Sequence, residues 1–575
     1  MRVILGINTF HTDSSACLLI NGKLVAAVEE ERINRKKHYS GYPIESIREC
    51  LKIGNVSEDE ITNIAFNTKP KSNFIAKSFF FIKNFKLRNN LHLNRISKKI
   101  SIRKTLFKHF KLNKNIKFHY IEHHLSHLAS VFYPSEFEKS NGLSIDGSGD
   151  FVTLAIAECQ NNKINIKEKI NFPNSLGIFY HAMTQFLGFK NYGEEYKMMG
   201  LAAYGSPIYF DKIKNNLFKN NHNYIFELNL DYFNHHKNNF KYIAENENLV
   251  IDKIYNSNLS KLFEKEIISH AKNDLFKKNF AASVQKIYEY FFLKILEKIK
   301  NKNFSDNLVF AGGCALNSSA NKLLTSNDKF FKNVYITFAP GDNGGALGAA
   351  FVVSAKYGEN KSNFANPYLG PKFNNDTVEN ILKSNLLKNK LYYDFLIDDK
   401  LYLETSKLIS NGNVVGWFQD QMEFGPRALG NRSILADPRN PKMKDIINLK
   451  IKRRESFRPF APSVLEDFQS EWFDSKFYSP YMSSVAIVKN NKKSFVPAIT
   501  HIDGTARLQS VSNTSNHKFY KLIKNFYNLT KVPILLNTSF NENEPIVMNP
   551  EEALDCLVRT DMDALIINNF LIRKI

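Results

Sequence analysis

Residues 335–351, YITFAPGDNGGALGAAF, decide the fold class, because one short stretch passes from a β-type run through a glycine-rich loop into a helical pattern. The backbone amides of such a loop can bind phosphate at the N-terminus of the helix. Three other apolar runs also end in glycine-containing turns: RVILGIN (2–8), GLSIDGSGD (142–150) and LVFAGGCALN (308–317). Ligands of open α/β sheets lie beyond the carboxyl ends of the strands, so we expect these loops to converge on one nucleotide. The sequence therefore predicts an α/β protein.

The chain is long enough for more than one domain, since its 575 residues exceed what one hydrophobic core normally serves. The best linker is GENKSNFANPYLGPKF (358–373), which is polar and interrupted by Pro and Gly. Beyond it the strand pattern starts again, with NVVGWF (413–418) and VPILLNTSF (532–540). We predict one domain over 1–360 and a second over 361–575.

The positive charge of the chain is concentrated in one block. The net charge is +22, and fifteen Lys and Arg residues fall within 69–117, inside a stretch (61–121) without any Asp or Glu. Its opening, FIAKSFFFIKNFKL (74–87), mixes lysines with large apolar residues, a composition that can contact an anionic membrane surface. The alternative is a lysine-rich helical insertion, near 69–118, packed against its own domain. A second, mostly helical insertion is expected near 205–305.

Composition excludes several classes of protein. The five cysteines are scattered and form no CxxC pair, which excludes zinc ribbons and suits a reducing cytoplasm. A chain with 43% hydrophobic and 23% charged residues is not mainly disordered. It opens without a basic-then-apolar leader, and no stretch approaches the roughly 18 apolar residues of a spanning helix. We expect a cytoplasmic protein, peripheral to the inner face of the membrane if the basic block attaches there.

Four residues are candidate metal ligands. His123 and His127 lie in EHHLSHLAS, and an i, i+4 pair points to one face of a helix, so both imidazoles can reach one ion. Asp146 in IDGSGD and Asp342 in PGDNGG stand in glycine turns at strand ends. A set of two His and two Asp is typical of a site for Fe(II), Mn(II) or Zn(II) with nitrogen and oxygen ligands, and less so of a structural zinc site built from thiolates. Structural histidines and turn-capping aspartates are the alternative.

A second group of residues is strongly basic and lies among glycines, aromatics and prolines. Its members are Arg427, Arg432, Lys452, Arg453, Arg454 and Arg458. Guanidinium groups bind phosphate or carboxylate in a bidentate fashion, so the segment is typical of an anion site. The alternative is a solvated basic helix. Phe424, Gly425 and Pro426 are poor material for such a helix and favour a loop that presents Arg427.

About ten motifs follow one another along the chain: GINTFHTDSSACLLINGKLVAAVEEERINRKKH, EHHLSHLAS, SIDGSGD, EYKMMGLAAYG, FAGGCALN, APGDNGGALGAA, FGPRALGNRSILADPR, KRRESFRPFAPSVL, ARLQSV and LNTSFN. In this order they resemble the nodulation- and cephamycin-type O-carbamoyltransferases, and the resemblance covers nearly the whole chain. It implies an N-terminal domain similar to the threonylcarbamoyl transferase of tRNA, in the actin/sugar-kinase ATPase superfamily. It also implies a C-terminal YrdC-like domain that makes carbamoyl adenylate.

The resemblance also implies substrates and residue roles. Carbamoyl phosphate and ATP would give carbamoyl adenylate, and the carbamoyl group would pass to a hydroxyl of a small-molecule or glycan acceptor, in a natural product or a surface glycan. The four metal candidates would hold an iron ion beside the nucleotide. Residues carried over to the carbamoyl phosphate site are Arg427 and Lys452, as catalytic groups, with Arg458, Arg507 and Ser539. Residues expected to hold the nucleotide are Gly147, Ser148, Lys197, Gly312, Gly313 and Asn317.

The acceptor hydroxyl needs a base, and His11 is the candidate. Relatives in the family often have His directly before Asp in this loop, whereas here Thr12 separates His11 from Asp13 and puts the position of the base in doubt. A structural histidine is the alternative. His38 and Lys197 are the next candidates, although Lys197 is better suited to phosphate because a lysine is mostly protonated near pH 7.

Two other functions stay open. The basic block favours a tRNA-type carbamoylating enzyme, because aromatics between lysines can stack on bases. The excess charge is local, however, so we do not expect a nucleic-acid partner. A non-catalytic ATP-binding switch of the actin or chaperone-ATPase type would leave the arginines and the metal candidates without a role. A metalloprotease is excluded because no HExxH is present. A homo-oligomer stays open.

Overall fold

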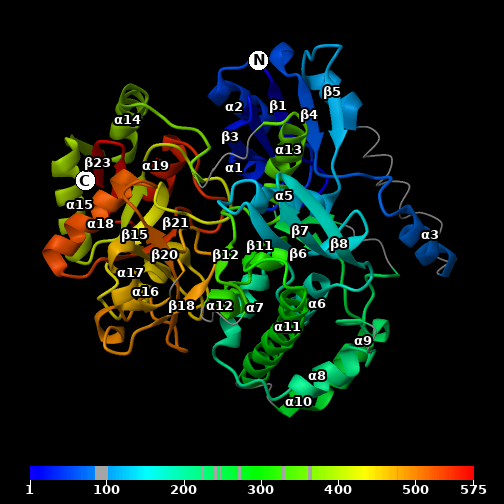
Figure 1. The fold of residues 1–575 in the computed structure, drawn as a ribbon. Coiled ribbons are helices and arrows are strands. Elements are labelled where there is room, and N and C mark those ends of the chain that lie inside the picture. The colour runs from blue at the N-terminus through cyan, green and yellow to red at the C-terminus, as the bar shows by residue number, and fades with distance from the viewer. Residues whose placement is uncertain are drawn as a thin grey trace. The chain divides into compact units, whose positions relative to one another are not determined.

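The computed structural model describes residues 1–83, 102–221, 224–237, 242–245, 248–269, 274–325, 330–359, 366–475 and 477–575. Part of the basic block (84–101) and the centre of the linker (360–365) lie outside these ranges. The chain forms two compact units (Figure 1). Unit 1 comprises Met1–Glu31 and Lys36–Ala365, and unit 2 comprises Arg32–Arg35 and Asn366–Ile575. Both units contain sheets covered by helices, which confirms the α/β class.

Unit 1 is built from two five-stranded sheets of identical strand order. The first sheet, in the order β3-β2-β1-β4-β5, contains β1 (Val3–Asn8), β2 (Ser15–Ile20), β3 (Lys23–Glu29), β4 (Asn63–Phe66) and β5 (Lys117–Tyr120). The second sheet, in the order β8-β7-β6-β11-β12, contains β6 (Lys139–Gly149), β7 (Val152–Gln160), β8 (Lys163–Asn171), β11 (Asn307–Ala311) and β12 (Asn333–Tyr335). In each sheet the three strands that come first in the chain are antiparallel and the last two add in parallel. This duplication is the architecture implied by the resemblance to actin and the sugar kinases.

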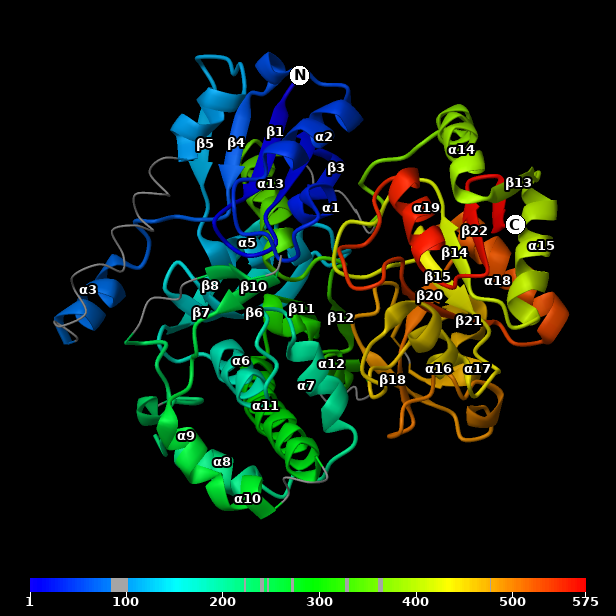
Figure 2. The ribbon, with the colours of Figure 1, turned by 180° about the vertical axis from the view of Figure 1, so that it is seen from behind.

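Two helices lie between these sheets, as Figures 1 and 2 show. α5 (His123–Phe132) packs on the second sheet, and α13 (Gly345–Lys356) packs on the first sheet and against α5. The helices approach closely because α13 is rich in small residues. A Cβ atom added at Gly348 would lie 1.8 Å from the carbonyl oxygen of Ser126. The glycine-rich run that decided the fold class therefore packs one helix against the other.

Helices dominate the rest of unit 1. They are α2 (Ile44–Gly54), α3 (Phe74–Lys83), α6 (Leu176–Phe186), α7 (Glu195–Ala202), α8 (Phe210–Leu217), α9 (Ser257–Leu262), α10 (Glu264–Ser269), α11 (Leu275–Asn301) and α12 (Ser318–Thr325). The short helix α1 (Glu30–Asn34) begins in unit 1, and its residues from Arg32 onward are assigned to unit 2. Within the segment 205–305 the structure describes the helices α8, α9, α10 and α11. The segment also contains an unpredicted hairpin, formed by β9 (Tyr242–Glu245) and β10 (Asn248–Ile251).

Unit 2 is organised around a mixed eight-stranded sheet. Its strands, in spatial order, are β13 (Leu391–Phe395), β23 (Phe570–Lys574), β22 (Ala564–Ile567), β14 (Val415–Phe418), β15 (Arg432–Ala436), β21 (Ile534–Ser539), β16 (Ala461–Leu465) and β20 (Gln509–Val511). A small sheet contains β17 (Phe473–Asp474), β18 (Val485–Val488) and β19 (Thr505–Arg507). The helices are α14 (Asn375–Asn389), α15 (Asp398–Ser410), α16 (Met443–Ile447), α17 (Gln469–Trp472), α18 (His517–Thr530) and α19 (Pro550–Arg559). One continuous core, which includes Trp417 and Phe526, holds sheet and helices together.

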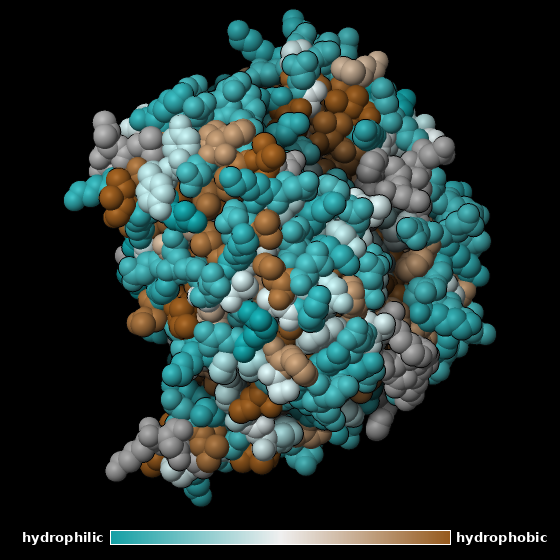
Figure 3. Space-filling view, turned by 90° about the vertical axis from the view of Figure 1, so that its left-hand side faces the viewer, coloured by the Kyte–Doolittle hydropathy of each residue, from teal (hydrophilic) through white to brown (hydrophobic). Residues whose placement is uncertain are grey.

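The surface in Figure 3 is mainly hydrophilic, with hydrophobic residues in small separate groups, as is usual for a folded domain. Within the described ranges, no helix has both the length and the apolar character that crossing a membrane requires.

Candidate active site

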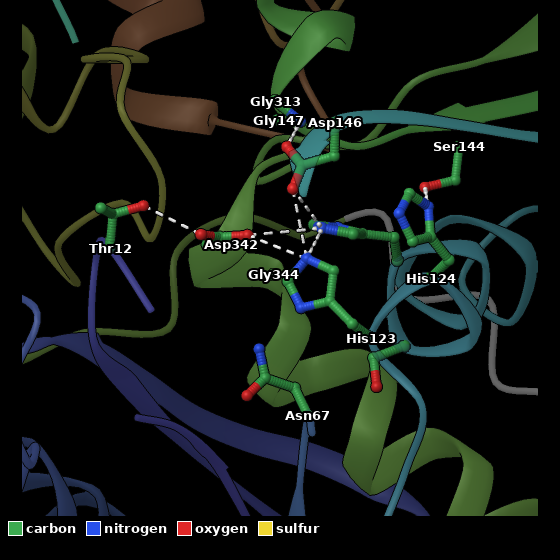
Figure 4. A network of polar contacts seen from close by, with 12 residues as sticks. Thr12, Asn67, His123, His124, Ser144, Asp146, Gly147, Gly313, Asp342 and Gly344 are labelled. Carbon is green, nitrogen blue, oxygen red and sulfur yellow. Dashed lines mark hydrogen bonds and ion pairs between the residues drawn. The ribbon is translucent and has the colours of Figure 1, made fainter. Parts of the chain in front are cut away.

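Four side chains from three elements of unit 1 lie close together, and Figure 4 shows three of them, His123, Asp146 and Asp342, directed toward one another. Glu122 caps α5 by accepting a hydrogen bond from the backbone N–H of Leu125 at 2.8 Å, which places His123 in the first turn and His127 one turn later. Asp146 lies on β6, and Asp342 begins the turn before α13. The structure thus brings together the four residues that the sequence proposed as ligands.

The geometry of this group fits a metal ion. One ligand atom from each residue lies within 4.8 Å of the other three. The Nε2 atoms of His123 and His127 are 3.0 Å apart, and their distances to the carboxylates of Asp146 and Asp342 run from 3.2 to 3.9 Å. Ligands about 2.1 Å from a tetrahedral metal ion lie about 3.4 Å from one another. Buried nitrogen and oxygen ligands at this spacing are suited to a divalent cation.

The charges of the group hold it together. Burial opposes charge on His123, but hydrogen bonds to Asp146 and Asp342 outweigh burial and raise the pKa of His123 well above its usual value. Burial also opposes charge on Asp146, but the two histidines hold the pKa of its carboxyl well below the usual range. A metal ion would have to displace the protons on these imidazoles.

His124 has a different role from its neighbours. Its Nδ1 lies 2.9 Å from Ser144 Oγ and its Nε2 lies 2.9 Å from the carbonyl oxygen of Val152. Burial, followed by the positive charges of His123 and His127, lowers the pKa of His124 to about 3. This histidine is therefore neutral and links α5 to the second sheet.

The structure places His11 beside the proposed ligands. Its half-buried ring stacks on that of His123, with 4.6 Å between centroids and 28° between planes. Thr12 donates a hydrogen bond to Asp342 Oδ2 at 2.9 Å, and its hydroxyl lies 2.9 Å from that of Tyr192. Thr12, the residue between His11 and Asp13, therefore contacts Asp342, one of the proposed metal ligands. His11 still lies beside these ligands.

The two other candidate bases form ion pairs. His38 Nδ1 lies 2.7 Å from Asp13 Oδ1; burial lowers the pKa of His38, but the Asp13 carboxylate outweighs burial and raises it to about 9. His38 is therefore a cation near pH 7. Lys197 Nζ lies 2.7 Å from Glu194 Oε1. Neither geometry favours these residues as the base.

The predicted nucleotide loops lie next to Asp146. Gly313 donates its N–H to Asp146 Oδ1 at 2.8 Å. Gly312 adopts φ +90°, and a Cβ atom there would lie 2.2 Å from the carbonyl oxygen of Ile145, so this glycine allows the two loops to touch. Gly147 faces open space and Ser148 is exposed. The loop is therefore open at Gly147 and Ser148, next to the close contact between the loops at Gly312 and Gly313.

Asn317, which we expected at the nucleotide, contacts protein groups instead. Its amide nitrogen donates to Gln285 Oε1 at 3.1 Å, and its amide oxygen accepts from the N–H of Ala320 at 3.0 Å. The bond from Ala320 caps α12, and the bond to Gln285 ties the loop to α11.

In unit 2, four arginines form an electropositive cluster. Arg507 is at its centre: burial lowers its pKa well below the usual value, and the charges of Arg427, Arg454 and Arg458 lower it further. Its Nε has no hydrogen-bond partner among the described residues. Several positive charges held close together in a half-buried position are favourable for binding an anion such as phosphate. Arg454 was not among the residues that the resemblance carried over to the carbamoyl phosphate site.

Lys452 and Ser539 contact each other and stabilise a turn. Lys452 is 1% exposed, and its Nζ donates to the carbonyl oxygens of Ser539 and Asn541 at 2.6 and 2.8 Å and to Asn541 Oδ1 at 2.7 Å. An ammonium group has three hydrogens, so these oxygens occupy its donors. In this structure Lys452 holds the turn in place, whereas we expected it to hold carbamoyl phosphate.

Other basic residues of the segment are structural or exposed. Arg432 is fully buried, lies over the ring of Phe418 at 3.6 Å, and donates to the carbonyl oxygens of Gln419 and Asn431 at 2.6 and 2.9 Å. The side chain of Arg453 is 61% exposed.

Two residues near the cluster were missed by the sequence analysis. Burial first, and then the positive charges of Arg507 and Lys444, lower the pKa of His501 to about 4 against the opposing effect of Asp503, so this imidazole is neutral. Glu423 is 4% exposed, and its Oε1 accepts the N–H groups of Leu429, Asn431 and Arg432 at 2.7, 2.8 and 3.1 Å. No motif identifies either residue.

Glu423 is expected to fix the loop that carries Arg427. Glu423→Ala leaves three backbone donors without their acceptor, so we expect a loss of about 3 kcal/mol in the free energy of unfolding. Denaturant unfolding measures this loss, and the KM for carbamoyl phosphate, the substrate that the sequence resemblance implies, should rise at the same time. Glu471→Ala, at a carboxylate 52% exposed, is the control and should change neither. A Glu423→Ala variant of unchanged stability and KM would contradict this role.

In comparisons with known proteins, both halves of the chain match models of carbamoyltransferases. Residues 3–351 match the family model described as carbamoyltransferase N-terminus, and residues 406–574 match carbamoyltransferase C-terminus. Protein sll1178 of Synechocystis sp. is 38% identical, with 100% of this chain and 97% of that protein covered. Nodulation protein NolNO of Sinorhizobium fredii is 35% identical, with 99% of this chain and 80% of that protein covered. Nodulation protein NolO of Bradyrhizobium diazoefficiens is 36% identical, with 79% of each covered. The chain therefore belongs to the carbamoyltransferase family and is an enzyme that transfers carbamoyl groups.

Proposed function

We propose that the enzyme moves the carbamoyl group of carbamoyl phosphate, by way of carbamoyl adenylate, to a hydroxyl of a sugar-containing acceptor. Carbamoyl phosphate and water give carbamate and phosphate. Carbamate and ATP give carbamoyl adenylate and pyrophosphate, and the acceptor hydroxyl then displaces AMP. The observation that carries the proposal is the convergence of His123, His127, Asp146 and Asp342 beside the glycine loops of unit 1.

In unit 2 the arginine cluster would bind the phosphate of carbamoyl phosphate and then that of the adenylate. Arg507 is half-buried beside the charges of Arg427, Arg454 and Arg458, so an anion would relieve the repulsion between them. Guanidinium groups fixed in a partly dry pocket also stabilise negative charge that develops as a phosphate bond breaks. Lys452 and Ser539 would support this site by holding the turn at Asn541.

In unit 1 the open space at Gly147 and the glycine loops would receive the adenylate. A divalent cation held by the four ligands, with Fe(II) preferred to Mn(II) or Zn(II), would neutralise charge on the nucleotide phosphate. Thr12 orients Asp342 through its hydrogen bond. His11, stacked on His123, would accept the proton of the acceptor hydroxyl.

Mass spectrometry of candidate glycans tests the proposal. The purified enzyme, incubated with ATP, carbamoyl phosphate and a glycan pool, should release pyrophosphate and add one CHNO unit to a sugar. Omission of either ATP or carbamoyl phosphate should abolish both products. Transfer from carbamoyl phosphate that continues without ATP would overturn the adenylate step. An adduct on tRNA in place of a glycan would overturn the proposed acceptor.

A further inference from the structure

One helix of unit 1 exposes large apolar side chains along one face. In α3, Phe74, Ile75, Phe79 and Ile82 are 73, 73, 71 and 73% exposed. With 100° of rotation per residue, these four positions fall within an arc of about 140°. A continuous apolar face of this size on an exposed helix indicates an interaction surface.

The opposite side of α3 is anchored to unit 1. The ring of Phe80 packs against those of Phe151 and Phe172, with 5.5 Å between centroids in each case. Just before the helix, Asn73 donates to the carbonyl oxygen of Asp150 at 3.0 Å. Figures 1 and 2 both show α3 at the outer edge of unit 1. The exposed face is therefore held outward by contacts on the other side of the helix.

The sequence around this face is strongly basic. The stretch 61–121 contains no acidic residue and fifteen Lys and Arg residues. Those that the structure describes as exposed are Lys69, Lys71, Arg103, Lys104, Lys108, Lys111, Lys114 and Lys117. Lys69 and Lys71 are exposed and directly precede α3 in the chain, so a partner of the apolar face must tolerate positive charge beside it.

We propose that α3 binds the surface of an anionic lipid bilayer. The helix would lie in the plane of the interface, with Phe74, Ile75, Phe79 and Ile82 among the acyl chains and the neighbouring lysines at the headgroups. Nucleic acid fits less well, because the aliphatic side chains of Ile75 and Ile82 offer no ring for base stacking. A second copy of the chain would place two basic stretches against each other. This surface is independent of the proposed reaction.

Vesicle sedimentation with the full-length protein tests the proposal. The protein should bind vesicles in which about a third of the lipid is phosphatidylglycerol, and bind pure phosphatidylcholine at least about tenfold less. Binding to the anionic vesicles should weaken as salt is raised. Equal binding to both lipids, or none to the anionic vesicles, would overturn the proposal.

Two double variants test the role of the apolar face. Ile75→Asp with Phe79→Asp should lower vesicle partitioning at least about tenfold, since it removes two apolar anchors and adds two like charges to those of the lipid. The matched control is Phe495→Asp with Ile502→Asp, two residues of unit 2 that are 55 and 66% exposed, and it should bind as the wild type does. Both variants should keep carbamoyl transfer. A wild-type level of vesicle binding in the α3 variant would overturn the proposal, as would an α3 defect seen only in RNA binding or self-association.

Discussion

Replacement of Asp146 by Asn is expected to abolish carbamoyl transfer while pyrophosphate release from ATP and carbamoyl phosphate continues. Asp146 Oδ2 lies 3.2 Å from His123 Nε2 and 3.9 Å from His127 Nε2, and Oδ1 accepts the N–H of Gly313. The amide removes the negative charge and turns one acceptor into a donor. We expect transfer to fall at least about a hundredfold, the upper end of the loss caused by disturbing a contact that supports a metal site.

Three measurements check this prediction: the metal content of the purified variant, pyrophosphate release, and transfer to the acceptor. Metal content should fall together with transfer. Asp306→Asn, at a carboxylate 43% exposed on the surface of unit 1, is the matched control and should leave all three unchanged. Two outcomes would contradict the proposal that the half-reactions are separable. One is transfer that continues after the metal is lost, and the other is an equal loss of transfer and of pyrophosphate release.

The sequence predicted the elements of unit 1 well because its signals there are local. The runs at 2–8 and 308–317 became β1 and β11, since short apolar segments that end in glycine turns suit buried strands. His123 and His127 were separated by one helical turn, so their convergence followed from helix periodicity alone. Asp146 and Asp342 were found from the glycines that flank them.

The contacts in unit 2 could not be predicted, because they depend on residues far away in the chain. Lys452 has the same chemistry whether it meets a phosphate or protein oxygens, and its partners at Ser539 and Asn541 are 87 and 89 positions away. Arg454 and Arg453 are neighbours in sequence, yet Arg454 belongs to the half-buried arginine cluster and Arg453 is exposed. Two such residues differ in their exposure to solvent, and this exposure cannot be derived from a single sequence.

Arg507→Ala should block adenylate formation and at the same time make the protein more stable. The side chain is half-buried and its pKa is lowered by burial and by three neighbouring arginines, so without an anion its charge destabilises the fold. Its removal should raise the Tm. Adenylate formation should fall at least about a hundredfold, because a charged donor to the phosphate is lost. A purely structural arginine would give a lower Tm instead.

The prediction is tested by giving the variant pre-made carbamoyl adenylate. Transfer from this intermediate should continue at the wild-type rate, because the proposed transfer residues are all in unit 1. Arg507→Lys keeps the charge but loses the bidentate fork, so it should restore only part of adenylate formation. Arg453→Ala, which removes a side chain 61% exposed, is the control and should change neither activity nor Tm. Loss of transfer from the pre-made adenylate would mean that Arg507 acts after the intermediate has formed, and the arginine cluster would then belong to the transfer step.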